Sequence, residues 1–250
     1  MIIDLAGSPS SAMPAGSTVL VPVGSTEQHG PHLPLGTDTM IASAVAAGLA
    51  ARVEPASPDP GSLDRGPELA AVLAPALAYG SSGEHQGFAG TVSIGRDALE
   101  LLLVELVRSL STWAGRIVLV NGHGGNVPTL ATAVTRLRAE GHPVSWLPCA
   151  APGADAHAGR TETSLLLHLA PGSVDLTLAE PGNTAPLAEI MGPMMRGGVA
   201  AVSANGILGD PTGASAREGL AILEAMVDGA LRRLIEDRVD DRGCLLDPLS

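Results

Sequence analysis

The chain contains no lysine, and its fourteen basic residues are all arginine. This absence excludes a Schiff-base lysine, a pyridoxal-phosphate lysine and a P-loop lysine together. Aromatic residues make up only 2% of the 250 residues, so the core must be built from Ala, Val, Leu and Ile. The net charge of −12 argues against a nucleic-acid partner, because such binding depends on clustered basic residues.

Cysteines and long hydrophobic runs are also scarce. The two cysteines, Cys149 and Cys244, lie far apart and match no disulfide or zinc pattern, so we expect a reducing, cytoplasmic setting. No run approaches the roughly 20 apolar residues that a membrane helix needs. The first residues lack the basic and apolar segments of a secretory signal. We therefore expect no membrane partner.

Strand-like and helix-like segments alternate along the chain, which predicts an α/β domain with a mostly parallel sheet. Strands are expected over residues 18–23, 91–94, 117–120 and 144–147. Helices are expected over residues 39–53, 96–113, 126–140, 162–169 and from a cap at Ser215 to about 238. Residues 54–67 are rich in Pro, Asp, Ser and Gly and predict a surface loop. Without repeats or a linker, residues 1–250 should form one domain.

Three segments carry the residue types of a metal site. The first holds Glu27, His29 and Asp38, the second is the Gly-rich turn around His123, and the third spans residues 155–162. Carboxylates beside imidazoles suit divalent transition metals such as Zn, Fe or Mn. In α/β folds, chemistry gathers where strands end. We therefore expect these segments to converge at one edge of the sheet.

The ligand types fit two metal ions that share one carboxylate. Asp38 would bridge the ions, one ion would bind His29 and the other His123, and each would take a further carboxylate from Glu27 or Glu162. Two divalent cations against three carboxylates and one hydroxide come out roughly neutral, as a buried site requires. Two-metal sites of this kind activate water and stabilise a developing oxyanion.

Each segment also has a simpler interpretation. The first can be a polar loop with no ligand role, although its clustered Gly and Pro imply a tightly fixed backbone. The His123 turn can be an anion-binding loop at a helix N-terminus, which would make the protein an anion- or nucleotide-binding module rather than an enzyme. The third can be an ordinary helix start with acidic residues in its first turn. The absence of lysine and of a G-x-G-x-x-G spacing favours the metal site.

The same motifs, in the same order, resemble the creatininase family of metal-dependent amidohydrolases. The resemblance runs from about residue 19 to residue 219 through the stretches 27–38, 121–126 and 157–164. It implies a three-layer α/β/α fold with a mostly parallel central sheet. It also implies a dinuclear Zn, Mn or Fe centre, hydrolysis of a C–N amide bond and a homo-oligomer, with a hexamer as the family's typical assembly.

The resemblance assigns metal ligands by position. Those that match the family motif, with the aspartate bridging, are Glu27, His29, Asp38 and His123. Creatininase has a further ligand glutamate where this chain has Gly125. The missing oxygen must come from elsewhere, and Glu162 is the expected supplier.

Residues around the metals also have expected roles. By the resemblance, His157 matches the family's catalytic histidine and would protonate the leaving amine. Asp155, two residues before it, is the residue that we expect to orient its imidazole. A positioned acid of this sort contributes about 10²–10⁴ in rate. Glu84, His85 and Asp210 are the candidates for a wall that binds substrate.

Two further stretches, 80–88 and 205–211, resemble the branch of the family that accompanies mycofactocin biosynthesis. Members of that branch are peptidases that release a modified, Val-Tyr-derived C-terminal fragment from a small ribosomally made precursor. The resemblance therefore implies a small modified peptide as substrate. A sibling branch, which removes a formyl group from a pyrimidine nucleotide intermediate, shares the ligands and is the alternative. Gly125 and the presence of only two tryptophans, Trp113 and Trp146, weigh against creatinine hydrolysis.

Overall fold

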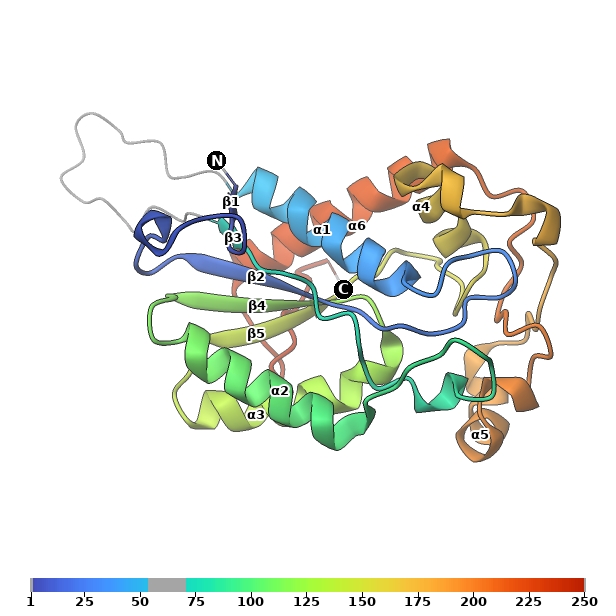
Figure 1. Cartoon of the computed structure of the whole chain (residues 1–250), viewed down its shortest axis with the longest axis horizontal. Helices are drawn as coiled ribbons and strands as arrows, with labels where there is room; N and C mark the ends of the chain where they lie inside the picture. The colour runs from blue at the N-terminus through green and yellow to red at the C-terminus, as the bar shows by residue number, and fades with distance from the viewer. Residues whose placement is uncertain (1, 54–70, 250) are drawn as a thin grey trace.

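Five parallel strands form the centre of the fold, in the spatial order β1-β3-β2-β4-β5 (Figure 1). The computed structural model describes residues 2–53 and 71–249. Within them the strands are β1 (Ile3–Asp4), β2 (Thr18–Val23), β3 (Ala71–Leu73), β4 (Arg116–Asn121) and β5 (Val144–Pro148). The central strands β2 and β4 pair along their whole length, from Thr18 opposite Arg116 to Val23 opposite Asn121.

Helices cover both faces of this sheet (Figure 1). One face carries α1 (Thr37–Arg52), α4 (Arg160–Leu169) and α6 (Ala216–Glu236). The other carries α2 (Gly95–Leu110) and α3 (Val127–Ala139), and α5 (Leu187–Gly197) lies beyond the carboxyl ends of the strands. Among the described residues, no helix combines the length and the apolar character needed to cross a membrane.

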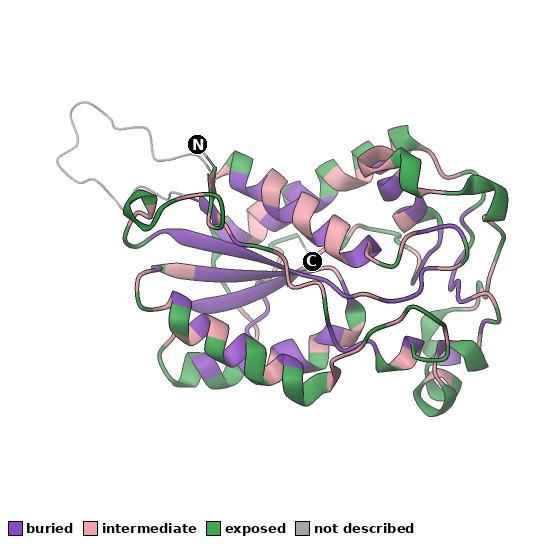
Figure 2. Ribbon diagram, viewed as in Figure 1, coloured by how far each residue is buried: buried purple, intermediate pink, exposed green. Residues whose placement is uncertain are grey.

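The central strands are buried on both faces, which is typical of parallel sheets (Figure 2). Alternate side chains of one strand enter different cores, because successive residues of a strand point to opposite faces. Val19 and Val21 of β2 pack in the core with α2 and α3. Leu20 packs with α1, α4 and α6. The predicted three-layer α/β/α architecture is therefore confirmed.

The sequence prediction fails at residues 91–94, which form no strand. Val92 makes one isolated antiparallel bridge, in which its N–H donates to the carbonyl of Thr26 at 2.8 Å. The β-branched run finds no free sheet edge beside β2, because β3 and β4 occupy both of its sides. The sequence also does not predict the short strands β1 and β3 or the helix α5. The loop expected over residues 54–67 lies outside the described residues.

The arrangement of β2 and β4 creates a place for a site. The two strands are neighbours, but the chain leaves β2 toward α1 on one face and leaves β4 toward α3 on the other. Such a divergence opens a crevice at the carboxyl ends of the strands, where ligands bind in α/β folds. The first two metal-type segments directly follow these two strands.

Candidate metal centre

The predicted ligands converge at the carboxyl ends of β2 and β4, and nearly all are buried. Glu27 and His29 lie in the loop after β2 and are fully buried, and Asp38 in the first turn of α1 is 2% exposed. His123 follows β4 and is 5% exposed. Glu162 lies in the first turn of α4 and is half-buried. All five predicted ligands therefore belong to one cluster.

Asp38 lies at the centre of this cluster, with one carboxylate oxygen facing His29 and the other facing His123. Its Oδ1 is 3.1 Å from Nε2 of His29, and its Oδ2 is 3.3 Å from Nδ1 of His123. Glu162 Oε2 adds to the His29 side, 3.8 Å from the same Nε2. Glu27 Oε1 adds to the His123 side, 3.2 Å from the same Nδ1. This is the geometry that a bridging carboxylate needs.

Backbone carbonyls fix which nitrogen of each imidazole carries the proton. Nδ1 of His29 lies 3.1 Å from the carbonyl of Glu27, and Nε2 of His123 lies 3.2 Å from the carbonyl of Ser81. A carbonyl only accepts hydrogen bonds, so these two nitrogens must donate. In the neutral rings, the other two nitrogens therefore direct lone pairs at the carboxylates. Lone pair and carboxylate repel each other unless a proton or a metal cation lies between them.

In the absence of metal, protons take the place of that cation. Burial lowers the pKa of His29, but the surrounding carboxylates, Asp38 foremost, outweigh it and raise the pKa from 6.5 to about 10. Burial also lowers the pKa of His123, yet Glu27 and Asp38 raise it well above its usual value. Burial raises the pKa of Asp38, and the two histidines more than reverse that effect. The pocket is thus built to hold positive charge.

Two further observations show that the residues fit divalent cations. Both carboxylate oxygens of Glu27 are buried without a hydrogen-bond donor of good geometry, which is costly unless a cation satisfies them. In addition, ligand atoms lie within 4.8 Å of one another in three sets, Glu27/Asp38/His123, His29/Asp38/Glu162 and Glu27/His29/His157. Carboxylates and imidazoles suit Zn, Mn and Fe alike.

His157 lies against this cluster with its free nitrogen turned inward. Its Nε2 donates to the carbonyl of Gln28 at 2.8 Å, and its Nδ1 lies 3.8 Å from Glu27 Oε1. Burial, followed by the nearby His29 and His85, holds the pKa of His157 well below its usual value. The ring is therefore neutral, with a lone pair on Nδ1 that faces the cluster.

Gln28, which the sequence does not mark as a site residue, organises the histidines. Its Oε1 accepts the N–H of Gly30 at 2.8 Å, so its Nε2 is the donor and lies 3.0 Å from the carbonyl of Gly206 and 2.8 Å from Nδ1 of His85. The same Nε2 lies 3.0 Å from Nε2 of His157, which already donates elsewhere. The two amide protons therefore go to Gly206 and His85, and the His85 proton sits on Nε2, 3.2 Å from Glu27 Oε1. The only sequence signal is the position of Gln28 between two ligands.

Two predicted residues have other partners. Asp155 is predicted to orient His157, but its carboxylate accepts the backbone N–H groups of Arg160 and Thr161 at the start of α4. Among the described residues it shares no hydrogen bond with His157, so the orienting group is the carbonyl of Gln28. Asp210 is predicted in the substrate wall, but it is exposed, accepts the N–H of Thr212 at 2.9 Å and lines neither of the two cavities at the cluster.

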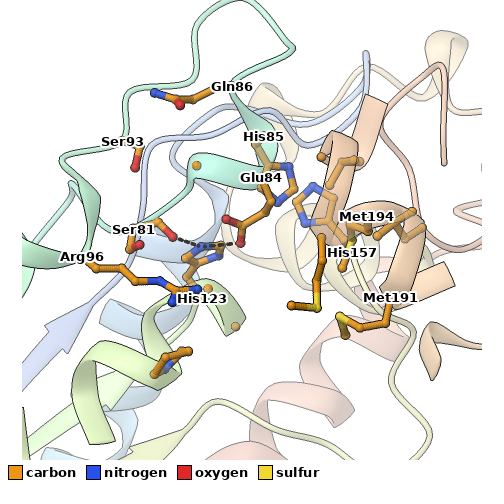
Figure 3. Close-up of a pocket in the computed structure, with 18 of the residues that line it drawn as sticks. Ser81, Glu84, His85, Gln86, Ser93, Arg96, His123, His157, Met191 and Met194 are labelled. Atoms are coloured by element: carbon orange, nitrogen blue, oxygen red, sulfur yellow. Dashed lines mark hydrogen bonds and ion pairs between the residues drawn. The ribbon is translucent and has the colours of Figure 1, made fainter. Parts of the chain in front are cut away.

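The larger cavity, of about 990 Å³, opens onto the cluster (Figure 3). Its walls come from residues around 81–86, from the start of α2, from the turn at 123–125 and from α5. Glu84 and His85 line it as predicted, with Glu84 Oε1 3.5 Å from Nε2 of His123. The smaller cavity, of about 190 Å³, reaches Asp38 and Glu162, and Asp155 also lines it.

Gly125 is required by close packing around His123. A Cβ at this position would lie 2.3 Å from both Glu84 Oε1 and His123 Nε2, and 2.6 Å from the carbonyl of Ser81. A glutamate at position 125 therefore has no room unless these groups move. This chain places the Glu84 side chain in that space instead.

Comparison with known protein families matches residues 10–234 to the creatininase family, described as creatinine amidohydrolase. This protein therefore belongs to the creatininase family. Two similar curated proteins are mycofactocin precursor peptide peptidases. The peptidase of Mycolicibacterium smegmatis is 58% identical over 228 residues, which cover 91% of this chain and 88% of that protein. The peptidase of Mycobacterium tuberculosis H37Rv is 54% identical over 232 residues, which cover 92% of this chain and 90% of that protein.

More distant relatives are creatininases themselves. The creatinine amidohydrolase of Pseudomonas putida is 30% identical over 261 residues, covering 89% of this chain and 91% of its own. The solved structure "Creatininase Mn" aligns with a TM-score of 0.72 at 26% identity, covering 95% of this chain and 99% of that one. A mutant creatininase of the Zn-Zn type aligns with a TM-score of 0.70 at 28% identity, covering 88% and 90%. These alignments confirm the creatininase-like fold.

Proposed function

We propose that this protein is a dinuclear metal-dependent peptidase that releases the modified, Val-Tyr-derived C-terminal fragment of the mycofactocin precursor peptide. The choice of substrate rests on one observation, the 58% identity over nine tenths of the chain to a mycofactocin precursor peptide peptidase. The choice of chemistry is supported by the lone pairs and carboxylates that face one another around Asp38.

Two sets of residues would hold two divalent cations, with Asp38 common to both. Glu27, Asp38 and His123 would hold one ion, and His29, Asp38 and Glu162 would hold the other, with Zn, Fe and Mn all suited to the donor set. When bound, such an ion pair supplies an activated water and stabilises the oxyanion that develops on a scissile carbonyl. The backbone carbonyls of Glu27 and Ser81 keep His29 and His123 in the tautomers that bind metal.

His157 moves the proton. Its Nδ1 lone pair faces the reacting centre, so this nitrogen takes a proton from the attacking water and passes it to the leaving amine. The Nε2–H bond to the Gln28 carbonyl keeps Nε2 protonated throughout, so Nδ1 is the nitrogen that accepts and releases the proton. A positioned acid–base group of this kind contributes about 10²–10⁴ in rate.

The size of the main cavity supports a peptide. Binding pockets for drug-sized ligands measure about 300–1,000 Å³, and the cavity of about 990 Å³ lies at the upper end of that range. Creatinine, a single small ring, would leave most of this volume unfilled. We further expect a homo-oligomer, as is typical of the family, and a reducing cytoplasmic setting.

The test is to incubate the metal-loaded protein with the modified precursor peptide and to follow the products by mass spectrometry. We expect the C-terminal fragment to appear, and the Asp38→Asn protein to leave the peptide intact. Parallel incubations contain a formamidopyrimidine nucleotide or creatinine. An intact peptide together with loss of the formyl group would identify the protein as a deformylase instead, and turnover of creatinine alone would identify a creatininase.

A further inference from the structure

Helix α5 presents an apolar face that is largely exposed, and only Met194 of this face packs against the small core cluster of Ile190, Val199 and Leu208. Leu187, Met191, Met194 and Met195 follow one another at helical spacing, and all four line the main cavity. Ile190 is the only buried residue of the helix. Met191 is 36% exposed and Met195 is 81% exposed, so this face is open to whatever enters the cavity. We call these four residues the methionine face.

The methionine face belongs to the same cavity as the candidate metal centre. Figure 3 shows Met191 and Met194 on the side opposite Ser81 and Arg96, with His157 between the two sides. The wall with Ser81, Ser93 and Arg96 is mainly polar, whereas the wall formed by α5 is mainly apolar, with Arg196 as its charged member. A peptide bound across the centre would therefore find the larger apolar surface on the α5 side.

The chemistry of this wall indicates which side chain it receives. None of the described residues that line the cavity is Phe, Tyr or Trp. Thioethers are flexible and polarisable, fit irregular shapes and make favourable contacts with the edges of aromatic rings. Met194 packs partly against the core cluster that Phe88 also contacts, whereas the thioethers of Met191 and Met195 are exposed and are therefore suited to a ring that the substrate brings.

We propose that the methionine face is the subsite for an aromatic side chain of the peptide substrate. This proposal rests on the proposed function and deepens it, because it assigns the specificity for that substrate to α5. The candidate metal centre carries out the hydrolysis, and Leu187, Met191, Met194 and Met195 select which peptide is positioned for it.

Kinetics with the precursor peptide provide the first test. The double variant Met191→Ala/Met195→Ala changes two exposed side chains and should not disturb folding. We expect KM to rise roughly tenfold, with kcat and metal content unchanged. The matched control is Glu189→Ala, an exposed residue of the same helix that does not line the cavity, and it should leave KM unchanged. An unchanged KM in the double variant would overturn the proposal.

Methyl NMR provides the second test and does not depend on turnover. The metal-loaded protein, labelled at the methionine methyl groups, is titrated with acetyl-glycyl-tyrosinamide and with acetyl-glycyl-leucinamide. We expect ring-current shifts of the methyl groups of Met191, Met194 and Met195, and only with the tyrosine peptide. Equal shifts with both peptides, or none at these three methyl groups, would overturn the proposal.

The two tests separate the failure of this inference from failure of the proposed function. If the protein does not cleave the precursor peptide, the proposed function fails, and the methyl shifts still report whether α5 binds an aromatic ring. If the protein cleaves the peptide but the double variant behaves like wild type, the proposed function stands and the role of the methionine face is wrong.

Discussion

The two sides of the main cavity differ in how far their side chains are fixed. On the side of the candidate metal centre, Glu27, His29 and His123 are at most 5% exposed, and each histidine donates to a backbone carbonyl. On the opposite side, the methionine face reaches 81% exposure at Met195. The first side has one arrangement, as chemistry requires, and the second can adapt to a substrate.

This comparison indicates that substitutions should affect metal content or kcat on the side of the candidate metal centre and KM on the side of the methionine face. Substitutions in the cluster should remove metal or turnover, because the proposed function assigns metal binding and proton transfer to these groups. Substitutions on the methionine face should change KM only. The effects should be largest at the shared carboxylate and smallest at the side chains that only position a histidine.

Replacing Asp38 by Asn should abolish both metal binding and peptide cleavage. One oxygen of Asp38 faces His29 and the other faces His123, so the loss of its charge weakens both metal positions at once. Elemental analysis should find about two ions per chain in the wild type and little metal in the purified variant. Two retained ions would show that Asp38 is no bridge.

Replacing His157 by Ala should lower kcat by about 10²–10⁴ while metal content stays at the wild-type level. The reason is that, in the proposed function, Nδ1 of His157 moves the proton and is not required to hold either ion. Asp155→Asn is the matched control, because Asp155 binds the start of α4 and not His157. A kcat for Asp155→Asn as low as that of His157→Ala would restore the orienting role expected for Asp155.

Removing the metals should lower the melting temperature by roughly 10 °C, since ligands at a thousandfold excess over Kd stabilise by about 4 kcal/mol. The metal-free His29 has a pKa of about 10 and is protonated at pH 8, so metal binding must displace its proton. Metal affinity should therefore rise with pH, and adding zinc to an unbuffered solution should acidify it. Scanning calorimetry of the chelator-treated protein measures the change in melting temperature, and titration calorimetry with zinc at several pH values measures the affinity and the proton release. An unchanged melting temperature would contradict the proposed stabilisation by metal. The double variant Met191→Ala/Met195→Ala should show the same metal-dependent shift as wild type.

Replacing Gln28 by Leu should lower kcat by roughly tenfold and the free energy of unfolding by about 1–3 kcal/mol, because Gly206 and His85 lose a buried donor. KM and metal content should stay unchanged. Gln28→Glu should not rescue the defect, since a carboxylate cannot donate to the Gly206 carbonyl. A wild-type kcat in both variants would show that Gln28 is only structural.

Much of the side of the cavity that holds the candidate metal centre could be predicted from the sequence. The bounds of β2 agree with the predicted strand, because its residues are β-branched, apolar and followed by Gly24. The types and order of Glu27, Asp38 and His123 indicate shared ligands. Parallel strands that end at one sheet edge bring such segments together, so sequence order alone carries this part of the prediction.

The rest depends on contacts that no local pattern encodes. Gln28 meets His85 across 57 positions and Gly206 across 178, so its role depends on tertiary packing. Asp155 has the acidity expected of an orienting group, but its carboxylate binds the N–H groups at the start of α4 instead. The helix α5 shows amphipathic spacing, but only Ile190 and Met194 pack in a core cluster while Leu187, Met191 and Met195 line the cavity, and the sequence does not distinguish the two.

Anomalous diffraction from crystals grown with zinc tests the central claim most directly. We expect two peaks roughly 3.5–4 Å apart, one between Glu27 and His123 and the other between His29 and Glu162, each beside one oxygen of Asp38. A single peak, or peaks away from Asp38, would contradict the shared dinuclear centre.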